Sequence, residues 1–293
     1  MARRKTRRDK AGLREFAFRL HSWLGIGAVL YLACMAVTGS VLVFYPQLYA
    51  ALSPHPSVSS HLPTLTDEQL RGIFAKTRPG DEVNWIWARP ASGVFEVRLS
   101  HAHRETSRLI NAFTGDDLGP AYPATVEALN LMKRFHQDLF LGTVGRVVNL
   151  TGGLILAALA VTGAAIWWPG KHRWRRHLMV RTHSRGRRLA WEAHSAVGFW
   201  SMVFQLMWGI TGFEIVLNSM GISSTDSGWI EFAYKLHFGT FEGRFPAGAW
   251  ALAALTVPLL AITGLRMWWA RSAKDRKPRH YRPVPDSVVL SDG

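Results

Sequence analysis

Four histidines of this 293-residue sequence each precede a Thr-Gly pair at a repeated spacing. They are His21, His136, His194 and His237. Thr-Gly follows His21 and His194 by 17 residues, and it follows His136 and His237 by 26 residues. Imidazole is a usual axial ligand of haem iron, and helical bundles hold cofactors between side chains of facing helices. The paired spacing therefore predicts that these histidines bind haem.

The surroundings of the histidines repeat as well, without a gap. His21-Ser22, with Gly25 one turn later, recurs as His194-Ser195 and Gly198 at a constant offset of 173 residues. The segments that follow His136 and His237 match at an offset of 101 residues, and this match extends to two Trp-Trp pairs. The register predicts two helix-pair units related by an axis along the membrane normal.

Small residues lie beside the first pair of histidines. A glycine one helical turn after each of them shares the face of the histidine. The glycine leaves a flat gap next to the imidazole ring, which a planar macrocycle would fill. The alternative is that glycine, alanine and serine permit close helix packing and that the histidine caps the interface.

The charge pattern predicts the elements that carry the histidines. No Asp, Glu, Lys or Arg occurs in residues 20–66, 147–170, 193–213 and 245–265. Each stretch reaches the roughly 20 residues that a helix needs to cross the hydrocarbon core. We expect an all-α membrane bundle of four transmembrane helices, built as a duplicated helix pair. Its spans are predicted at residues 20–45, 141–169, 191–217 and 245–269.

The net charge of +15 fits the topology of such a bundle better than a nucleic-acid site. Of the 35 Lys and Arg residues, 8, 8 and 7 lie in residues 1–19, 170–190 and 266–293. These segments share one side if every stretch crosses. Positive charge gathers on the cytoplasmic side of membrane proteins. We therefore expect a cytoplasmic arm at 1–19, a cytoplasmic loop at 170–190, a cytoplasmic tail at 270–293, and contact with the lipid bilayer.

Residues 46–140 are predicted to form a small α+β extracytoplasmic domain inserted between the first two spans. Thr66–Thr77 is typical of a helix, with Thr66 as its N-cap and Gln69 completing a capping box. Alternating residues predict an antiparallel sheet with strands at 83–89, 93–100 and about 108–113. Residues 218–244 form a second outer loop.

The depth of the histidines predicts two unlike pairs. His21 and His194 lie at the cytoplasmic ends of their spans, where they can clamp one iron. His136 and His237 precede the outward-facing ends of their spans, where they can clamp a second iron near the outer surface. Two haems across a bilayer carry electrons from one side to the other. Histidines on both faces of each iron leave no open position, which favours electron transfer over oxygen chemistry.

The second pair lies before the apolar part of its spans. A straight helix from His136 to the end of its span would be about 50 Å long. We therefore expect the helices either to project outward or to bend at Gly142 and Gly243. Arg146 and Arg244 are candidates to meet haem propionates there, although snorkelling to lipid headgroups explains them equally well.

Several motifs occur together in this chain. They are RLHSWLG at 19–25, the Thr-Gly pairs, Trp167-Trp168-Pro169, Leu236-His237-x-Gly239, and in the insert the TDEQL helix start at 66–70 and LINAFTG at 109–115. With these motifs, residues 14–270 resemble the PepSY-associated transmembrane family, and the insert looks like a PepSY domain.

The resemblance implies a bacterial inner-membrane protein regulated by iron. Members of the family include ferric-siderophore reductases that bind two b-type haems. The resemblance would carry haem ligation to His21, His136, His194 and His237. It implies a membrane-bound ferric-chelate reductase that takes electrons from a cytoplasmic donor or from quinol and reduces a ferric siderophore or another ferric chelate outside, in iron uptake.

Two other classes of function remain open. One is a non-redox membrane sensor or protease-regulating partner protein that acts through the PepSY-like domain. In that domain, Trp85 and Trp87 share one face of a strand, as core residues or as a docking surface for an apolar ligand. The other class, a secondary transporter, is less favoured because the spans lack several buried charges. Glu214, at the end of the third span, is a further candidate functional residue.

Overall fold

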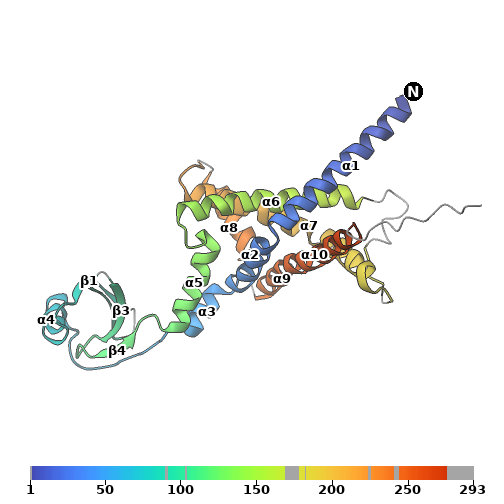
Figure 1. Cartoon of the computed structure of the whole chain (residues 1–293). Coiled ribbons are helices and arrows are strands. Elements are labelled where there is room, and N and C mark those ends of the chain that lie inside the picture. The colour runs from blue at the N-terminus through green and yellow to red at the C-terminus, as the bar shows by residue number, and fades with distance from the viewer. Residues whose placement is uncertain are drawn as a thin grey trace, which may run out of the picture. The chain divides into compact units, whose positions relative to one another are not determined.

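The computed structural model describes residues 2–89, 92–102, 104–168, 178–181, 183–223, 226–240 and 244–275 (Figure 1). The chain divides into two compact units, one of residues 1–40 with 146–293 and one of residues 41–145. Residues 170–177 and 182 of the predicted basic loop, and residues 276–293 of the predicted tail, lie outside the described residues.

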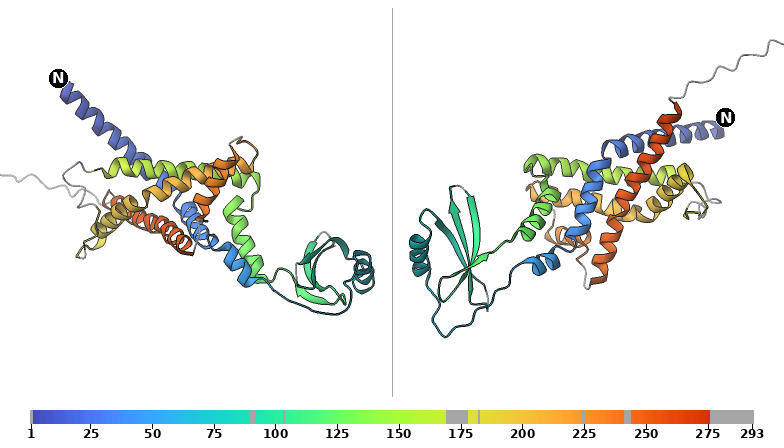
Figure 2. Two further views of the ribbon diagram at one scale, coloured as in Figure 1. Left: turned by 180° about the vertical axis from the view of Figure 1, so that it is seen from behind. Right: turned by 60° about the horizontal axis from the view of Figure 1, so that its bottom comes forward.

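The first unit is helical. Its helices are α1 (Ala2–Gly27), α2 (Val29–Leu42), α6 (Thr143–Trp167), α7 (Gly186–Ser219), α8 (Ser227–Phe238), α9 (Arg244–Ala254) and α10 (Thr256–Asp275), of which α2 ends and α6 begins inside the second unit. Helix α7 packs against α10 and α8, and α1 contacts α10 (Figure 2). The long helices therefore form one bundle around α7 and α10.

Within the described part of the chain, three helical segments are long and apolar enough to cross a membrane. They are α6, α7 and residues 246–273, and the bent pair α1 and α2 makes a fourth if it counts as one span. Between 11% and 22% of the residues in the most apolar windows of the three segments are buried. Most of their apolar surface therefore points outward, where a soluble protein would carry polar residues and a lipid-facing helix carries apolar ones.

The first segment differs from the single helix expected over residues 20–45. Helix α1 already begins at Ala2, and the chain bends by 66° between α1 and α2. Gly25 and Gly27 lie just before this break, and glycine weakens a helix because it loses the most backbone freedom on ordering. The first candidate span is therefore two helices with a break at Ala28 rather than one straight helix.

The last segment has a short break beside a proline. Helices α9 and α10 are separated at Leu255, three residues before Pro258. Proline has no N–H to donate, and its ring clashes with the carbonyl four residues earlier, which here belongs to Ala254. The break is slight, because residues 246–273 still count as one helical segment.

Glycines let α6 approach its neighbours closely. A Cβ added to Gly153 would lie 2.9 Å from the carbonyl oxygen of Gly209, and a Cβ on Gly209 would lie 2.8 Å from that of Gly153. A Cβ on Gly152 would lie 2.2 Å from the hydroxyl of Tyr31, which donates a hydrogen bond to Asn149 at 3.0 Å. Small residues of this kind allow backbones to meet in membrane helix bundles.

The second unit combines three helices with an antiparallel sheet. Its elements are α3 (Tyr45–Leu52), α4 (Asp67–Thr77), β1 (Glu82–Arg89), β2 (Val94–His101), β3 (Arg104–Asn111), β4 (Asp117–Pro120) and α5 (Ala124–Asp138). The sheet order is β1-β2-β3-β4. Leu70 and Phe74 of α4 pack on Val97, Leu99 and Ile110, so α4 covers one face of the sheet.

The local predictions for this unit are largely confirmed. Thr66 caps α4, and both hydrogen bonds of the capping box with Gln69 are present. The short strand β4 and the helices α3 and α5 were not predicted. Trp85 and Trp87 stack on each other, with ring centroids 5.5 Å apart, and they are 41% and 53% exposed. The two tryptophans are therefore not part of the domain core.

Candidate functional site

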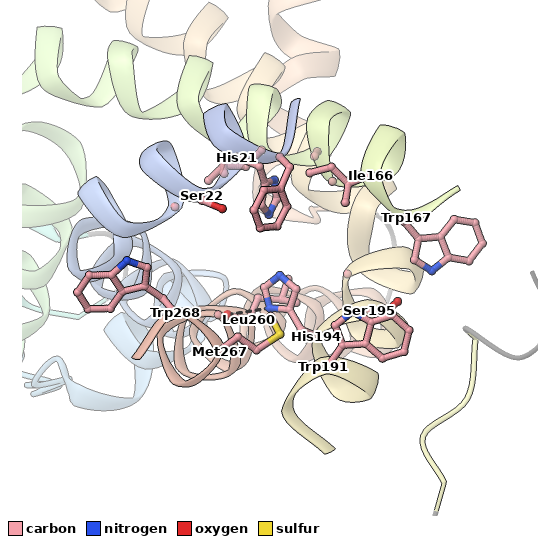
Figure 3. Close-up of a pocket in the computed structure, with 18 of the residues that line it drawn as sticks. His21, Ser22, Ile166, Trp167, Trp191, His194, Ser195, Leu260, Met267 and Trp268 are labelled. Carbon is pink, nitrogen blue, oxygen red and sulfur yellow. Dashed lines mark hydrogen bonds between the residues drawn. The ribbon is translucent and has the colours of Figure 1, made fainter. Parts of the chain in front are cut away.

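A cavity of about 920 Å³ lies inside the first unit, between α1, α2, α6, α7 and α10. His21 of α1 and His194 of α7 point into it from opposite sides, and Trp167 of α6 and Trp268 of α10 flank the pair (Figure 3). The centroids of the two imidazole rings are 6.2 Å apart, and the ring planes are perpendicular, at 90°. The structure therefore brings the first predicted pair together.

The distance between the rings suits one metal atom bound by both. With metal–imidazole bonds of about 2 Å, two rings on opposite sides of one metal have centres roughly 6 Å apart. Among the described residues, no three His, Cys, Asp or Glu side chains gather around a possible ion. A bare ion would thus have only two ligands of these four types here, whereas the iron of a planar macrocycle needs no more than two.

Threonine hydroxyls determine which ring nitrogen faces the cavity. The Nδ1 atoms of His21 and His194 lie 3.0 Å from Oγ1 of Thr162 and of Thr263. Each hydroxyl donates its single proton to a backbone carbonyl in the preceding turn. With that proton on the carbonyl, the hydroxyl oxygen accepts from the histidine, an arrangement that assigns the proton of the ring to Nδ1. The carbonyl of Leu260 lies 3.1 Å from Nδ1 of His194, and since a carbonyl only accepts, this contact also requires a proton on Nδ1. Nε2 is left with a free lone pair, the form that binds metals.

The glycine of each Thr-Gly pair makes room for the ring. A Cβ added to Gly163 would lie 3.3 Å from Cε1 of His21, and one on Gly264 would lie 3.3 Å from Cε1 of His194. In each Thr-Gly pair, the threonine thus supplies a hydrogen-bond acceptor and the glycine leaves space for the imidazole ring of the neighbouring helix. Sequence reasoning missed this role of the threonines, although their fixed register to the histidines was the signal.

The walls of the cavity repeat as the sequence does. Every lining residue except Trp168, Arg188 and Arg271 has a partner 173 or 101 positions away that also lines the cavity. In Figure 3 the repeat-related pairs face each other: His21 lies across from His194, and Trp167 lies on the side opposite Trp268. The cavity therefore has an approximate two-fold axis that passes between the histidines.

His237 occupies the same local arrangement at the end of α8. Its Nδ1 lies 3.0 Å from Oγ1 of Thr211, whose proton is donated to a carbonyl in the preceding turn. Trp208 donates to the carbonyl of His237 at 3.1 Å, and Trp250 donates to the preceding carbonyl at 2.7 Å. A Cβ on Gly212 would lie 3.1 Å from Cε1 of the histidine. The histidine is thus positioned from α7 and α9.

His136 lies on α5, in the second unit, and its ring is half-buried. Helix α5 ends two residues later, where Leu139 adopts a left-handed conformation with φ 53°. Gly142 has φ 58°, just before α6 begins. The helix therefore ends here, as the expected bend at Gly142 requires. Gly243, the corresponding position before the last span, lies outside the described residues.

The other charged candidates lie at helix ends. Arg146 donates to the carbonyl of Ser219 at 3.1 Å, near the end of α7. Glu214 accepts a hydrogen bond from the Ser223 hydroxyl at 2.6 Å. The side chain of Arg244 lies outside the described residues.

Comparison with known proteins places the chain in a family. Over 98 residues it is 34% identical to an uncharacterised protein of Pseudomonas aeruginosa, a match that covers 32% of this chain and 23% of that protein. The family described as the PepSY-associated TM region matches residues 18–228, which include His21, His136 and His194, whereas His237 lies beyond the match. Since the matched region is well over half of the chain, the protein belongs to the family of PepSY-associated transmembrane regions.

Proposed function

We propose that the protein is a membrane-bound dihaem b electron-transfer protein that reduces an acceptor outside the cytoplasm, a ferric siderophore or another ferric chelate, in iron uptake. The observation that carries the proposal is the His21–His194 pair. The rings face each other at 6.2 Å, and each Nδ1 is held by a threonine of the neighbouring helix. Family membership supports the proposal.

The residues of the cavity fit a haem in three ways. His21 and His194 present Nε2 from opposite faces, their threonine partners hold the rings in place, and the lining is largely apolar, which keeps water from the site. A haem bound here supplies a one-electron couple. His21 and His194 would hold this haem, and with two protein ligands it would supply electron transfer rather than oxygen chemistry.

The second haem is assigned to His136 and His237 on the basis of the repeat. His237 has the threonine and glycine arrangement of His21 and His194. His136 is its equivalent in the first helix pair, at the offset of 101 residues. This haem would lie nearer the acceptor, and the first would lie nearer the electron donor, a cytoplasmic reductant or quinol.

The proposal includes a topology. The bent pair α1 and α2 counts as one of four spans, together with α6, α7 and the helix over 246–273. The basic segments 1–19, 170–190 and 270–293 face the cytoplasm of a bacterium, and the protein lies in its inner membrane. The PepSY-like domain then lies outside, with the acceptor.

A reduced-minus-oxidised absorption spectrum of the purified full chain tests the proposal. We expect the α-band of b-type haem and two haems per chain. His21→Ala and His194→Ala should each lose one haem and block electron transfer, because the remaining histidine holds only one face. His61→Ala, which changes an exposed histidine of the second unit, should keep both haems.

Two results would contradict the proposal. Absence of b-type haem from the folded protein would remove the redox function and favour a sensor or partner protein. Two retained haems in His21→Ala or His194→Ala would show that these residues are not the axial pair.

A further inference from the structure

One repeat-related pair in the cavity wall is charged. Arg14 and Arg187 both line the cavity, and they are related by the same offset of 173 residues that relates His21 to His194. Each arginine precedes its histidine by seven residues, or about two helical turns, so each arginine shares a helix face with its histidine. Both arginines therefore lie at the same end of the cavity, on opposite sides of its two-fold axis.

Neither charge is neutralised by a carboxylate among the described residues. Arg14 donates one of its five N–H groups to the carbonyl of Ile166 at 2.8 Å, near the end of α6. By contrast, Arg188 is paired with Glu192 at 3.1 Å. Arg271 also has no carboxylate partner among the described residues, but it has no repeat partner in the lining, and its guanidinium lies over the ring of Phe18 at 4.9 Å. Arg14 and Arg187 are thus a repeat-related pair of positive charges, without a carboxylate partner among the described residues, at one end of a mostly apolar cavity.

The symmetry of the ligand matches this arrangement. Iron protoporphyrin IX carries both propionates on one edge. A two-fold rotation about an axis in the ring plane, through the iron and between the propionates, exchanges the two propionates and the two faces. The two-fold axis of the cavity exchanges the two histidines and the two arginines. When the two axes coincide, the haem can enter with its propionate edge towards the arginines or away from them. Only the first orientation pairs the propionates with the arginine charges.

We propose that Arg14 and Arg187 each bind one propionate of the haem held by His21 and His194, and so determine which edge of the haem enters the bundle. This inference rests on the proposed function. The opposite end of the cavity is lined by Leu32, Leu156 and Val257, and the nearby Gln205 amide is engaged with a serine of its own helix. Two carboxylates placed there would be buried without a partner, which is costly.

The test compares haem with its dimethyl ester, which lacks both negative charges. The full chain is prepared without haem in the His237→Ala background, so that the His21–His194 site is titrated alone. The starting protein should bind iron protoporphyrin IX roughly tenfold or more tightly than the ester, since two charge-assisted contacts are lost with the ester. Arg14→Gln with Arg187→Gln should abolish this preference, and Lys at both positions should restore part of it.

The matched control changes two arginines of the same segments that do not line the cavity, Arg19→Gln with Arg185→Gln, and it should keep the preference. Arg187→Gln is also tested alone. Arg14 donates a hydrogen bond to α6, so its loss could disturb the fold, whereas Arg187→Gln leaves this bond in place. Haem binding with an unchanged preference in the double Gln variant would overturn the propionate assignment only. Failure of the starting protein to bind either compound would overturn the proposed function as well.

Discussion

A single hydroxyl proton sets the chemistry of each histidine. In Thr162, Thr211 and Thr263 that proton goes to a carbonyl of the preceding turn, so the oxygen is left to accept from Nδ1–H. An acceptor that bonds the ring nitrogen away from the metal fixes the tautomer and the orientation of a metal-binding imidazole. The threonines therefore preorganise the rings before any ligand arrives.

Replacing these threonines by valine keeps their shape and removes the acceptor. For Thr162→Val with Thr263→Val we expect haem affinity at the His21–His194 site to fall by about 10- to 100-fold. Electron paramagnetic resonance of the ferric protein should lose the strongly anisotropic low-spin signal that perpendicular axial rings produce, because the rings are free to turn.

Thr151→Val is the matched control. Thr151 lies on α6 and makes the same bond to its preceding turn, but it is exposed and contacts no histidine in the described residues. Unchanged affinity and an unchanged signal in the double variant would show that the threonines are structural only.

At the scale of the elements, one carboxylate of the second unit connects two strands and a helix. Asp117 of β4 accepts from Arg108 of β3 and is paired with Arg78, which caps the end of α4. Partial burial by itself raises the pKa of Asp117. The hydrogen bonds from Arg108 and from the Gly119 N–H, together with the charges of Arg108 and Arg78, outweigh burial, so the pKa lies below its usual value. The short strand β4 is therefore anchored electrostatically.

Asp117→Asn should weaken this anchor. Because the folded-state pKa is lowered, the stability due to Asp117 is present above the ordinary carboxyl pKa and is lost as the pH falls through the lowered value. We expect a loss of about 1–2 kcal/mol at neutral pH that shrinks in acid. Amide hydrogen exchange of β3 and β4 in the full chain measures it.

Asp67→Asn serves as the control. Asp67 forms an exposed pair with Arg71 within α4, and such pairs contribute only a few tenths of a kcal/mol. A loss in Asp117→Asn that is independent of pH would contradict the electrostatic account.

At the scale of the whole molecule, the duplicated helix pair makes a cavity of two similar halves. The two halves differ chiefly at positions such as Leu32 and Gln205, or Ile26 and Phe199, which are related by the repeat but not identical. The two-fold rotation of the cavity turns one haem orientation into the other, and these orientations differ only in the order of methyl and vinyl groups. The same rotation exchanges Arg14 and Arg187, so the contacts of these arginines with the propionates favour neither orientation.

We therefore expect the haem of the His21–His194 site to bind in both orientations. Hyperfine-shifted haem methyl resonances of the ferric protein, in the His237→Ala background, should appear as two sets. Met202→Val makes position 202 identical to its repeat partner Val29, and it should bring the two populations closer to equality. A single set of resonances would mean that the small differences between the halves select one orientation.

The sequence by itself determined the apolar helices, the capped helix α4, the repeat and the choice of histidines. These follow from periodicity and spacing along one chain, which local physics controls. It did not determine the break at Ala28, the role of the threonines, or the perpendicular rings at 6.2 Å. Those depend on residues more than a hundred positions apart, such as His21 and Thr162, and only packing of one helix against another brings them within a hydrogen bond. The sequence thus showed which histidines repeat, and the tertiary structure decided what each ring contacts.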